Sequence, residues 1–250
     1  MLGEAKLAVA SGEPACVMDG VTVRYSPGLP PAVEGVSFRL GLGEMVLLAG
    51  PNGGGKSTIL KALIGLVRPE SGRVLVLGRD PVRDVGVRRL IGYVPQISEL
   101  NIHAPLTLWD LVSMGRRPRL GGLFRLSRED EEAVEEAVRL VGLSDKAFLK
   151  LSELSGGMLA RALIARAFVQ DPVMYFLDEP FESIDAQSES IIMELLVREK
   201  RRGKLVLIAE HHMGDLGAVD RVIYVNRRII AQGRPEEVLP RLGVPGMVGG

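Results

Sequence analysis

Residues 44–58 of this chain, EMVLLAGPNGGGKST, contain its clearest structural signal. The run Glu44–Ala49 is almost wholly apolar and bounded by glycines, which is typical of a parallel strand buried on both faces. The following run, Ser57–Leu66, has the spacing of a helix. Between them, Gly50–Thr58 matches the pattern G-x-x-x-x-G-K-[ST] in the strand–loop–helix setting that this pattern requires. We therefore predict a loop that binds the phosphates of a nucleoside triphosphate.

The residue types in this loop explain the prediction chemically. Glycines allow backbone N–H groups to turn toward phosphate oxygens, and the helix N-terminus adds a partial positive charge. We expect Lys56 to reach the outer phosphates and the Ser57 hydroxyl to ligate Mg²⁺. The predicted nucleotide-binding residues of the loop are Gly50, Pro51, Asn52, Gly53, Gly54, Gly55, Lys56, Ser57 and Thr58.

A second strand supplies the carboxylates that such a site needs. Val173–Leu177 is apolar and is followed directly by Asp178 and Glu179. We expect Asp178 to hold Mg²⁺ through water, because this ion prefers oxygen ligands. Glu179 is placed to act as the general base that orients the attacking water. Two acids can also simply end a strand, but their pairing with the lysine loop favours the catalytic interpretation.

The rest of the chain alternates strand-like and helical runs, which predicts an α/β fold with a parallel sheet. Two short runs near the N-terminus, Cys16–Tyr25 and Val36–Leu40, are typical of antiparallel strands. Residues 98–172 contain no convincing parallel strand, so a helical insert is expected there. One of its helices opens at Ser127 with a capping-box-like pattern, and another covers about 157–170. Further strand-like runs are Arg73–Leu77, Ile91–Val94, Leu205–Ala209 and Arg221–Val225.

Composition argues against several classes of function. Lys plus Arg and Asp plus Glu number 31 each, so the net charge gives no reason to expect a nucleic-acid partner. The single cysteine, Cys16, cannot form an intramolecular disulfide and is expected to be a small buried hydrophobe. No run approaches about 18 uninterrupted apolar residues, so we expect no membrane-spanning helix.

Residues 154–158, LSGGM, resemble the LSGGQ signature of ATP-binding-cassette ATPases, and they precede Asp178 as they do in that family. The run that follows, Arg161–Ala167, is similar to the family's signature helix. A Ser-Gly-Gly sequence at a helix N-terminus can form a second phosphate cradle. The resemblance implies that this cradle serves the nucleotide of the opposite subunit, so that a homodimer completes each site. The signature residues are Ser155, Gly156, Gly157 and Met158.

Further landmarks of the family follow in sequence order. Gln96 matches the Q-loop glutamine, which is expected near Mg²⁺ and the attacking water. Tyr25 matches the aromatic residue that stacks on adenine, although an ordinary strand tyrosine is an alternative. Ser183 and Asp185 resemble the D-loop at the dimer interface. His211 stands where the family places a switch histidine against the γ-phosphate, to which its imidazole can donate.

Two residues depart from the family's pattern. Met158 stands where glutamine is usual, and Glu210 precedes the histidine where serine or threonine is common. We prefer His211 to the adjacent His212, and the stretch from His211 to Asp220 is about one residue shorter than usual. The departures at Met158 and Glu210 do not remove a catalytic group.

The resemblance covers about residues 16–235 and implies an architecture. We expect residues 1–250 to form a single domain with a P-loop NTPase (RecA-like) parallel-sheet core and an N-terminal antiparallel β subdomain. These two parts would occupy residues 15–96 and 173–235. An inserted α-helical subdomain, residues 97–172, would carry the signature, and residues 236–250 would form a short tail.

Four passages resemble one branch of the family. Residues 91–96 and 105–116 look like the Q-loop region of zinc, manganese and iron importers and of their siderophore relatives. Residues 178–185 and 225–228 resemble the zinc and manganese branch. The resemblance implies ATP and Mg²⁺ as cofactors, transmembrane permease subunits as partners, an extracytoplasmic substrate-binding protein as an indirect partner, and a peripheral position on the cytoplasmic face of the cell membrane. The alternative is a soluble cassette ATPase such as an iron–sulfur assembly subunit.

The permease would be expected to dock on residues 97–124. Apolar anchors there are Leu106, Leu108, Trp109 and Leu111. A buried core helix would use the same residues, so the sequence leaves both interpretations open.

Overall fold

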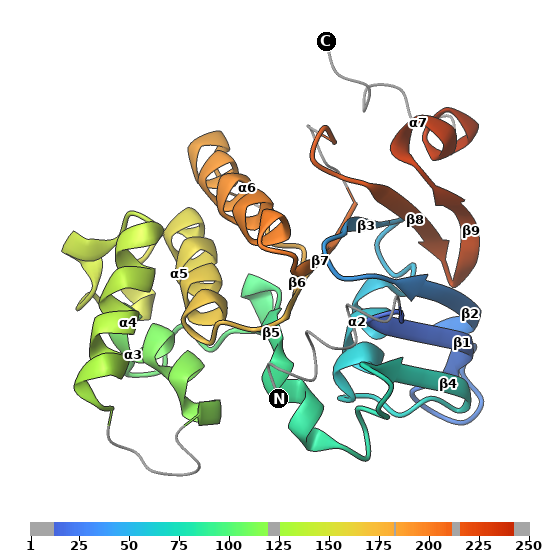
Figure 1. Cartoon of the computed structure of the whole chain (residues 1–250), viewed down its shortest axis with the longest axis horizontal. Helices are drawn as coiled ribbons and strands as arrows, with labels where there is room; N and C mark the ends of the chain where they lie inside the picture. The colour runs from blue at the N-terminus through green and yellow to red at the C-terminus, as the bar shows by residue number, and fades with distance from the viewer. Residues whose placement is uncertain (1–12, 120–125, 183, 212–215, 243–250) are drawn as a thin grey trace.

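Two sheets and a group of helices make up the structure, a computed structural model that describes residues 13–119, 126–182, 184–211 and 216–242 (Figure 1). Within these residues, one sheet has three antiparallel strands in the order β2-β1-β4, and the other has six strands in the order β5-β6-β7-β3-β8-β9. The smaller sheet contains β1 (Cys16–Val23), β2 (Val33–Leu40) and β4 (Ser71–Val76). The larger sheet contains β3 (Met45–Ala49), β5 (Ile91–Val94), β6 (Met174–Asp178), β7 (Leu205–Glu210), β8 (Arg221–Asn226) and β9 (Arg228–Gly233).

The strand order of the larger sheet brings distant segments of the chain together. β3 lies between β7 and β8 and is parallel to both, and β6 lies between β5 and β7 and is also parallel to both. β9 pairs antiparallel with β8 at the edge of the sheet. Because parallel strands end at the same edge, the segments that follow β3, β6 and β7 are neighbours in space. The predicted parallel core is therefore confirmed.

Apolar side chains cover both faces of the larger sheet. Along β3, Leu48 faces the core shared with the antiparallel sheet and α2 (Lys56–Ile64), whereas Leu47 faces the core shared with the remaining helices. A strand buried on both faces needs apolar residues at every position, which explains why its sequence was easy to recognise. Cys16 belongs to the first of these cores and is fully buried, as expected.

The helical insert lies on the side of the larger sheet away from the antiparallel sheet (Figure 1). It contains α3 (Leu108–Ser113), α4 (Arg128–Leu140) and α5 (Gly156–Val169). The predicted capping box of α4 is present, because the Ser127 hydroxyl accepts from the Asp130 N–H and the Asp130 carboxylate accepts from the Ser127 N–H. The buried stripe of α4, which includes Val134 and Val138, packs toward α5.

Some elements were not predicted. β9 and α6 (Ala186–Arg201) were missed, and the strand expected at Arg73–Leu77 is β4, which pairs with β1 in the antiparallel sheet. The helix α7 (Pro235–Val238) overlaps the start of the segment 236–250 that was expected as a tail, and it buries Val238 against the larger core. Short 3₁₀ turns cover Val85–Leu90, Ile97–Glu99, Met114–Arg119, Ser144–Lys146, Leu151–Glu153 and Pro240–Leu242. None of the helices in the described ranges is long and apolar enough to cross a bilayer.

The structure separates the four apolar residues of the expected docking segment into two that are buried and two that are partly buried. Leu108 and Leu111 are buried in the core between the helices, at 0% and 2% exposure. Leu106 and Trp109 are only partly buried at its margin. The Trp109 ring stacks on the ring of Phe148, with centroids 6.0 Å apart, and Phe148 is 78% exposed. Of the four residues, only Leu106 and Trp109 therefore remain accessible to another protein.

Candidate functional site

The loop from Gly50 to Gly55 joins β3 to α2 and folds tightly against the neighbouring strands. Gly50 has φ 151°, and a Cβ at this position would lie 2.0 Å from the carbonyl oxygen of Val225 in β8. Gly55 has φ 100°, and a Cβ there would lie 2.3 Å from Cγ1 of Val33 in β2. Only glycine fits both positions, so the loop backbone is held between β2 and β8.

Lys56 begins α2 and lies inside this loop. Its side chain is 3% exposed, and its Nζ donates to the carbonyl oxygens of Gly50 at 2.9 Å and Pro51 at 3.2 Å. The same Nζ lies 3.4 Å from Oε1 of Glu179. The lysine therefore links the phosphate loop to the carboxylate that follows β6.

Asp178, the last residue of β6, faces the start of α2. Its side chain is fully buried, and its Oδ1 accepts a hydrogen bond from the Ser57 hydroxyl at 2.9 Å. Its Oδ2 accepts from the Tyr93 hydroxyl at 3.5 Å. Burial raises the pKa of Asp178 to about 6, with Glu179 also raising it and the Ser57 hydrogen bond opposing the shift. A buried carboxylate that is costly to ionise is suited to a cation that would neutralise it.

Glu179 occupies a turn immediately after β6. Its φ is +48°, an unusual value for a residue other than glycine, and its N–H donates to the Ala209 carbonyl at 2.9 Å. Its Oε2 accepts from Nε2 of Gln96 at 2.7 Å. The strand order places Gln96, which follows β5, beside the end of β6, so the sheet brings these two predicted residues together.

Most of the phosphate loop, together with Gln96 and Glu179, lines one open pocket of about 520 Å³. Three of its lining residues, Ala32, Ser98 and Glu182, were not predicted. Ser98 and Glu182 follow predicted site residues closely in sequence, but no local pattern signals Ala32. The complete lining is Ala32, Asn52, Gly53, Gly54, Gly55, Lys56, Ser57, Thr58, Gln96, Ser98, Glu179 and Glu182.

The other predicted residues lie around this pocket. The hydroxyl of Tyr25 is 3.2 Å from Oγ1 of Thr58, and the tyrosine is 59% exposed, so its ring stands at the accessible edge of the loop. His211 directly follows β7, with its side chain 31% exposed and its Nδ1 3.5 Å from Oε2 of Glu210. His212 and Ser183 lie outside the described residues.

The signature sequence begins α5 and does not line the pocket. The Ser155 hydroxyl caps this helix by accepting from the Met158 N–H at 3.3 Å. A Cβ on Gly157 would lie 2.6 Å from Oδ2 of Asp185 and 2.7 Å from Oγ of Ser188. The predicted D-loop aspartate is thus packed against the signature within one chain.

Glu210 is the residue of this region whose importance the sequence did not reveal. It ends β7 at 2% exposure, with Oε1 accepting from the Phe181 N–H at 3.0 Å and Oε2 accepting from the His211 N–H at 3.2 Å. Burial raises its pKa to about 7, opposed by these two hydrogen bonds and assisted by the charge of Glu179. The unusual residue before the histidine was the available signal.

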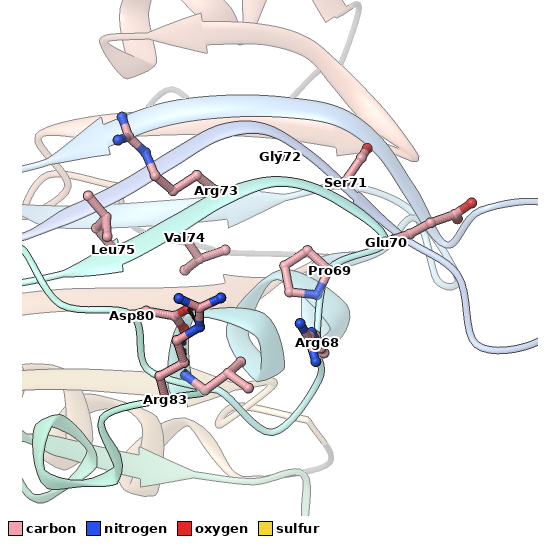
Figure 2. Close-up of a pocket in the computed structure, with 11 residues that line it drawn as sticks. Arg68, Pro69, Glu70, Ser71, Gly72, Arg73, Val74, Leu75, Asp80 and Arg83 are labelled. Atoms are coloured by element: carbon pink, nitrogen blue, oxygen red, sulfur yellow. Dashed lines mark hydrogen bonds and ion pairs between the residues drawn. The ribbon is translucent and has the colours of Figure 1, made fainter.

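A second pocket, of about 600 Å³, shares no lining residue with the first (Figure 2). Three arginines line it, namely Arg68, Arg73 and Arg83. Arg83 lies 3.5 Å from Asp80, and Arg73 lies 3.7 Å from Asp19. All three arginines are exposed.

A phosphate loop between β3 and α2, faced by carboxylates at the end of β6, defines a P-loop nucleoside triphosphatase. The family model described as ABC transporter matches residues 33–182. This chain belongs to the ABC transporter family, and it is an ATPase whose hydrolysis of ATP is coupled to transport.

Individual relatives agree with this assignment. The zinc transport system ATP-binding protein TroB of Treponema pallidum is 39% identical over 217 residues, which are 86% of this chain and 80% of TroB. The manganese transport system ATP-binding protein MntB of Bacillus subtilis is 38% identical over 222 residues, 88% of this chain and 87% of MntB. A solved dimeric bacterial ABC transporter cassette superposes with a TM-score of 0.75 and 27% identity, covering 88% of this chain and 98% of its own.

Proposed function

We propose that two copies of this chain enclose Mg·ATP between them and power a membrane permease that imports zinc, manganese or iron. The observation that carries the proposal is the contact network of five predicted residues at one end of the sheet. Lys56 approaches Glu179, Gln96 donates to Glu179, and Ser57 donates to Asp178. The network joins segments more than 80 residues apart in sequence.

In this proposal, residues of the network bind ATP and activate water. Lys56 exchanges the loop carbonyls for phosphate oxygens, which need its positive charge more strongly. Glu179 accepts a hydrogen bond from the attacking water, and Gln96 holds the Glu179 carboxylate in place for this role. His211 donates to the γ-phosphate as negative charge develops on it.

The donor set also fits Mg²⁺. The Ser57 and Asp178 oxygens lie 2.9 Å apart at the start of α2, and Gln96, which follows β5, would add a further oxygen ligand. No group of three or more His, Cys, Asp or Glu side chains in the described ranges could hold a metal alone, which agrees with an ion that takes further ligands from phosphates and water. When bound, Mg²⁺ would neutralise charge on the phosphates.

The dimer would complete each site. The signature residues begin α5, outside the pocket of their own chain, so Ser155, Gly156, Gly157 and Met158 would meet the nucleotide held by the second copy. Asp185 packs against Gly157, so movement of the D-loop would reach the signature directly. The existence of a related cassette as a dimer supports this arrangement.

The names of the relatives and one surface of the structure support the proposed cargo and permease. TroB and MntB are described as parts of zinc and manganese transport systems, which favours a metal importer over a soluble assembly ATPase. Trp109 and the exposed Phe148 provide an aromatic surface for a permease helix beside the Q-loop segment. This position would place the subunit on the cytoplasmic face of the membrane, with a substrate-binding protein acting on the permease from outside.

Glu179→Gln tests the proposed role of the general base and the proposed dimer. We expect the purified variant to bind ATP but to hydrolyse it at least about 100-fold more slowly, because general-base catalysis contributes roughly that factor. We also expect ATP to shift it to a dimer in light scattering. Glu135→Gln, which makes the same change on the exposed face of α4, should retain the wild-type rate. Wild-type hydrolysis by Glu179→Gln would disprove the role of the base.

A pull-down then tests the transporter. Tagged Glu179→Gln with ATP should retain a polytopic permease from mildly solubilised membranes, as identified by mass spectrometry. Metal accumulation in the source cells should fall when the gene for this chain is deleted. Recovery of soluble assembly proteins in place of a permease would contradict the transporter and leave the ATPase assignment standing.

A further inference from the structure

The buried carboxylate of Glu210 has no function in the mechanism above, although it lies between two of its residues. A charged group at 2% exposure needs compensating partners. Among the described residues, Glu210 forms no ion pair with a lysine or arginine. Its oxygens accept from two backbone N–H groups instead, those of Phe181 and His211.

The course of β6 and β7 explains why this carboxylate is needed. The two strands stay in parallel register as far as Asp178 and Ala209, and the Glu179 N–H makes one more ladder bond to the Ala209 carbonyl. The chain then turns away at Glu179, whose φ is +48°. The next residue is a proline, which has no N–H, so the first free donor belongs to Phe181. The side chain of Glu210 reaches this donor where the main chain of β7 no longer does.

The second oxygen of the same carboxylate controls the other strand end. It accepts from the His211 N–H at 3.2 Å and therefore fixes the direction in which the chain leaves β7. The usual serine or threonine is about two bonds shorter than glutamate, and its single oxygen could not accept from both N–H groups in this arrangement. The link is thus specific to a glutamate at this position.

We propose that Glu210 is a positioning residue for ATP hydrolysis, which holds the segment after Glu179 and the main chain of His211 in one fixed arrangement. The inference rests on the proposed roles of Glu179 and His211. Loss of the carboxylate would let the two segments move independently, and the base and the histidine would then seldom be in place together.

The test is a double-mutant cycle between Glu210 and His211. Glu210→Gln keeps the size of the side chain but replaces one acceptor with a donor that faces an N–H group. We expect kcat to fall about tenfold or more while the KM for Mg·ATP stays within about twofold, as for a residue that affects chemistry and not binding. In a His211→Ala background, the same substitution should reduce kcat less than about twofold further.

Stability and a matched control separate positioning from simple structural support. Glu210→Gln removes a buried charge but also leaves one buried N–H group without its acceptor, and because these two effects oppose each other its Tm at pH 8 should stay within a few degrees of the wild type even though kcat falls. Glu44→Gln is the same change in the residue before β3, at the end of the sheet opposite to Glu210, and it should leave kcat and KM unchanged. Additive losses in the cycle, or an unchanged kcat in Glu210→Gln, would overturn the inference. If His211→Ala and Glu179→Gln keep full activity, the proposed roles of the base and of the histidine fail, and the inference that rests on them fails as well.

Discussion

The buried carboxylate of Asp178 should make the nucleotide-free protein less stable at neutral pH than its Asn variant. Asp178 is fully buried, and its pKa rises from an ordinary value of 3.8 to about 6. This difference corresponds to about 3 kcal/mol, since each pKa unit is worth about 1.4 kcal/mol. Asn has nearly the same shape and can still accept the hydrogen bond from Ser57, so Asp178→Asn removes chiefly the cost of the charge.

The sign of the effect follows from proton binding. Between pH 3.8 and about 6 the folded protein binds the proton more tightly than the unfolded chain, so this group makes stability fall as pH rises. The free energy of unfolding of Asp178→Asn should therefore exceed that of the wild type by close to zero below about pH 4. The difference should reach about half of its full value at pH 5 and its full value of about 3 kcal/mol above about pH 7. For a chain of this size, 3 kcal/mol corresponds to a Tm difference of roughly 6–12 °C.

The assay is urea unfolding from pH 4 to pH 8 in EDTA without nucleotide, for the wild type, Asp178→Asn and Asp145→Asn. Asp145 has a side chain that is 74% exposed, so its variant should differ from the wild type by less than about 0.5 kcal/mol. Added Mg·ATP should stabilise the wild type more than Asp178→Asn, because the variant lacks a proposed metal ligand. An Asp178→Asn variant that is less stable than the wild type at pH 8 would show that the buried charge of Asp178 does not destabilise the nucleotide-free protein.

Three further predictions concern backbone positions. Gly50→Ala places a Cβ 2.0 Å from the Val225 carbonyl oxygen. It should lower the free energy of unfolding in urea by about 3 kcal/mol and abolish ATP binding in calorimetry. Retained affinity for ATP would contradict the predicted loop geometry. Gly157→Ala places a Cβ against Asp185, at a steric cost of about 1–2 kcal/mol. It should lower kcat roughly tenfold in an ATPase assay and leave the Kd for ATP unchanged. A change in Kd without a change in kcat would argue against a role of Gly157 in the dimer. Arg227 has φ +59°, so Arg227→Gly should stabilise the fold by about 0.5–1 kcal/mol in urea unfolding, whereas Arg227→Ala, which keeps the strain, should not.

Much of the fold and of the nucleotide site could be predicted from the sequence because its signals are local. The apolar run before Gly50 is sufficient to predict a buried parallel strand, since each of its positions faces a core. The loop that follows needs its glycines and Lys56 within nine consecutive residues, so the spacing itself carries the chemistry. The helix cap at Ser127 is likewise contained within four residues.

Tertiary structure alone decided which of these local pieces meet. The order β5-β6-β7-β3-β8-β9 brings Gln96 to Glu179 and Glu210 to Phe181, and no pattern within either segment specifies the other. The half-exposed strand β9 was missed because it lacks the continuous apolar run of a central strand. Ala32 enters the pocket only because β2 packs against the phosphate loop. Local sequence determines the conformation of each segment, whereas the pairing of strands far apart in the chain determines which side chains share a site.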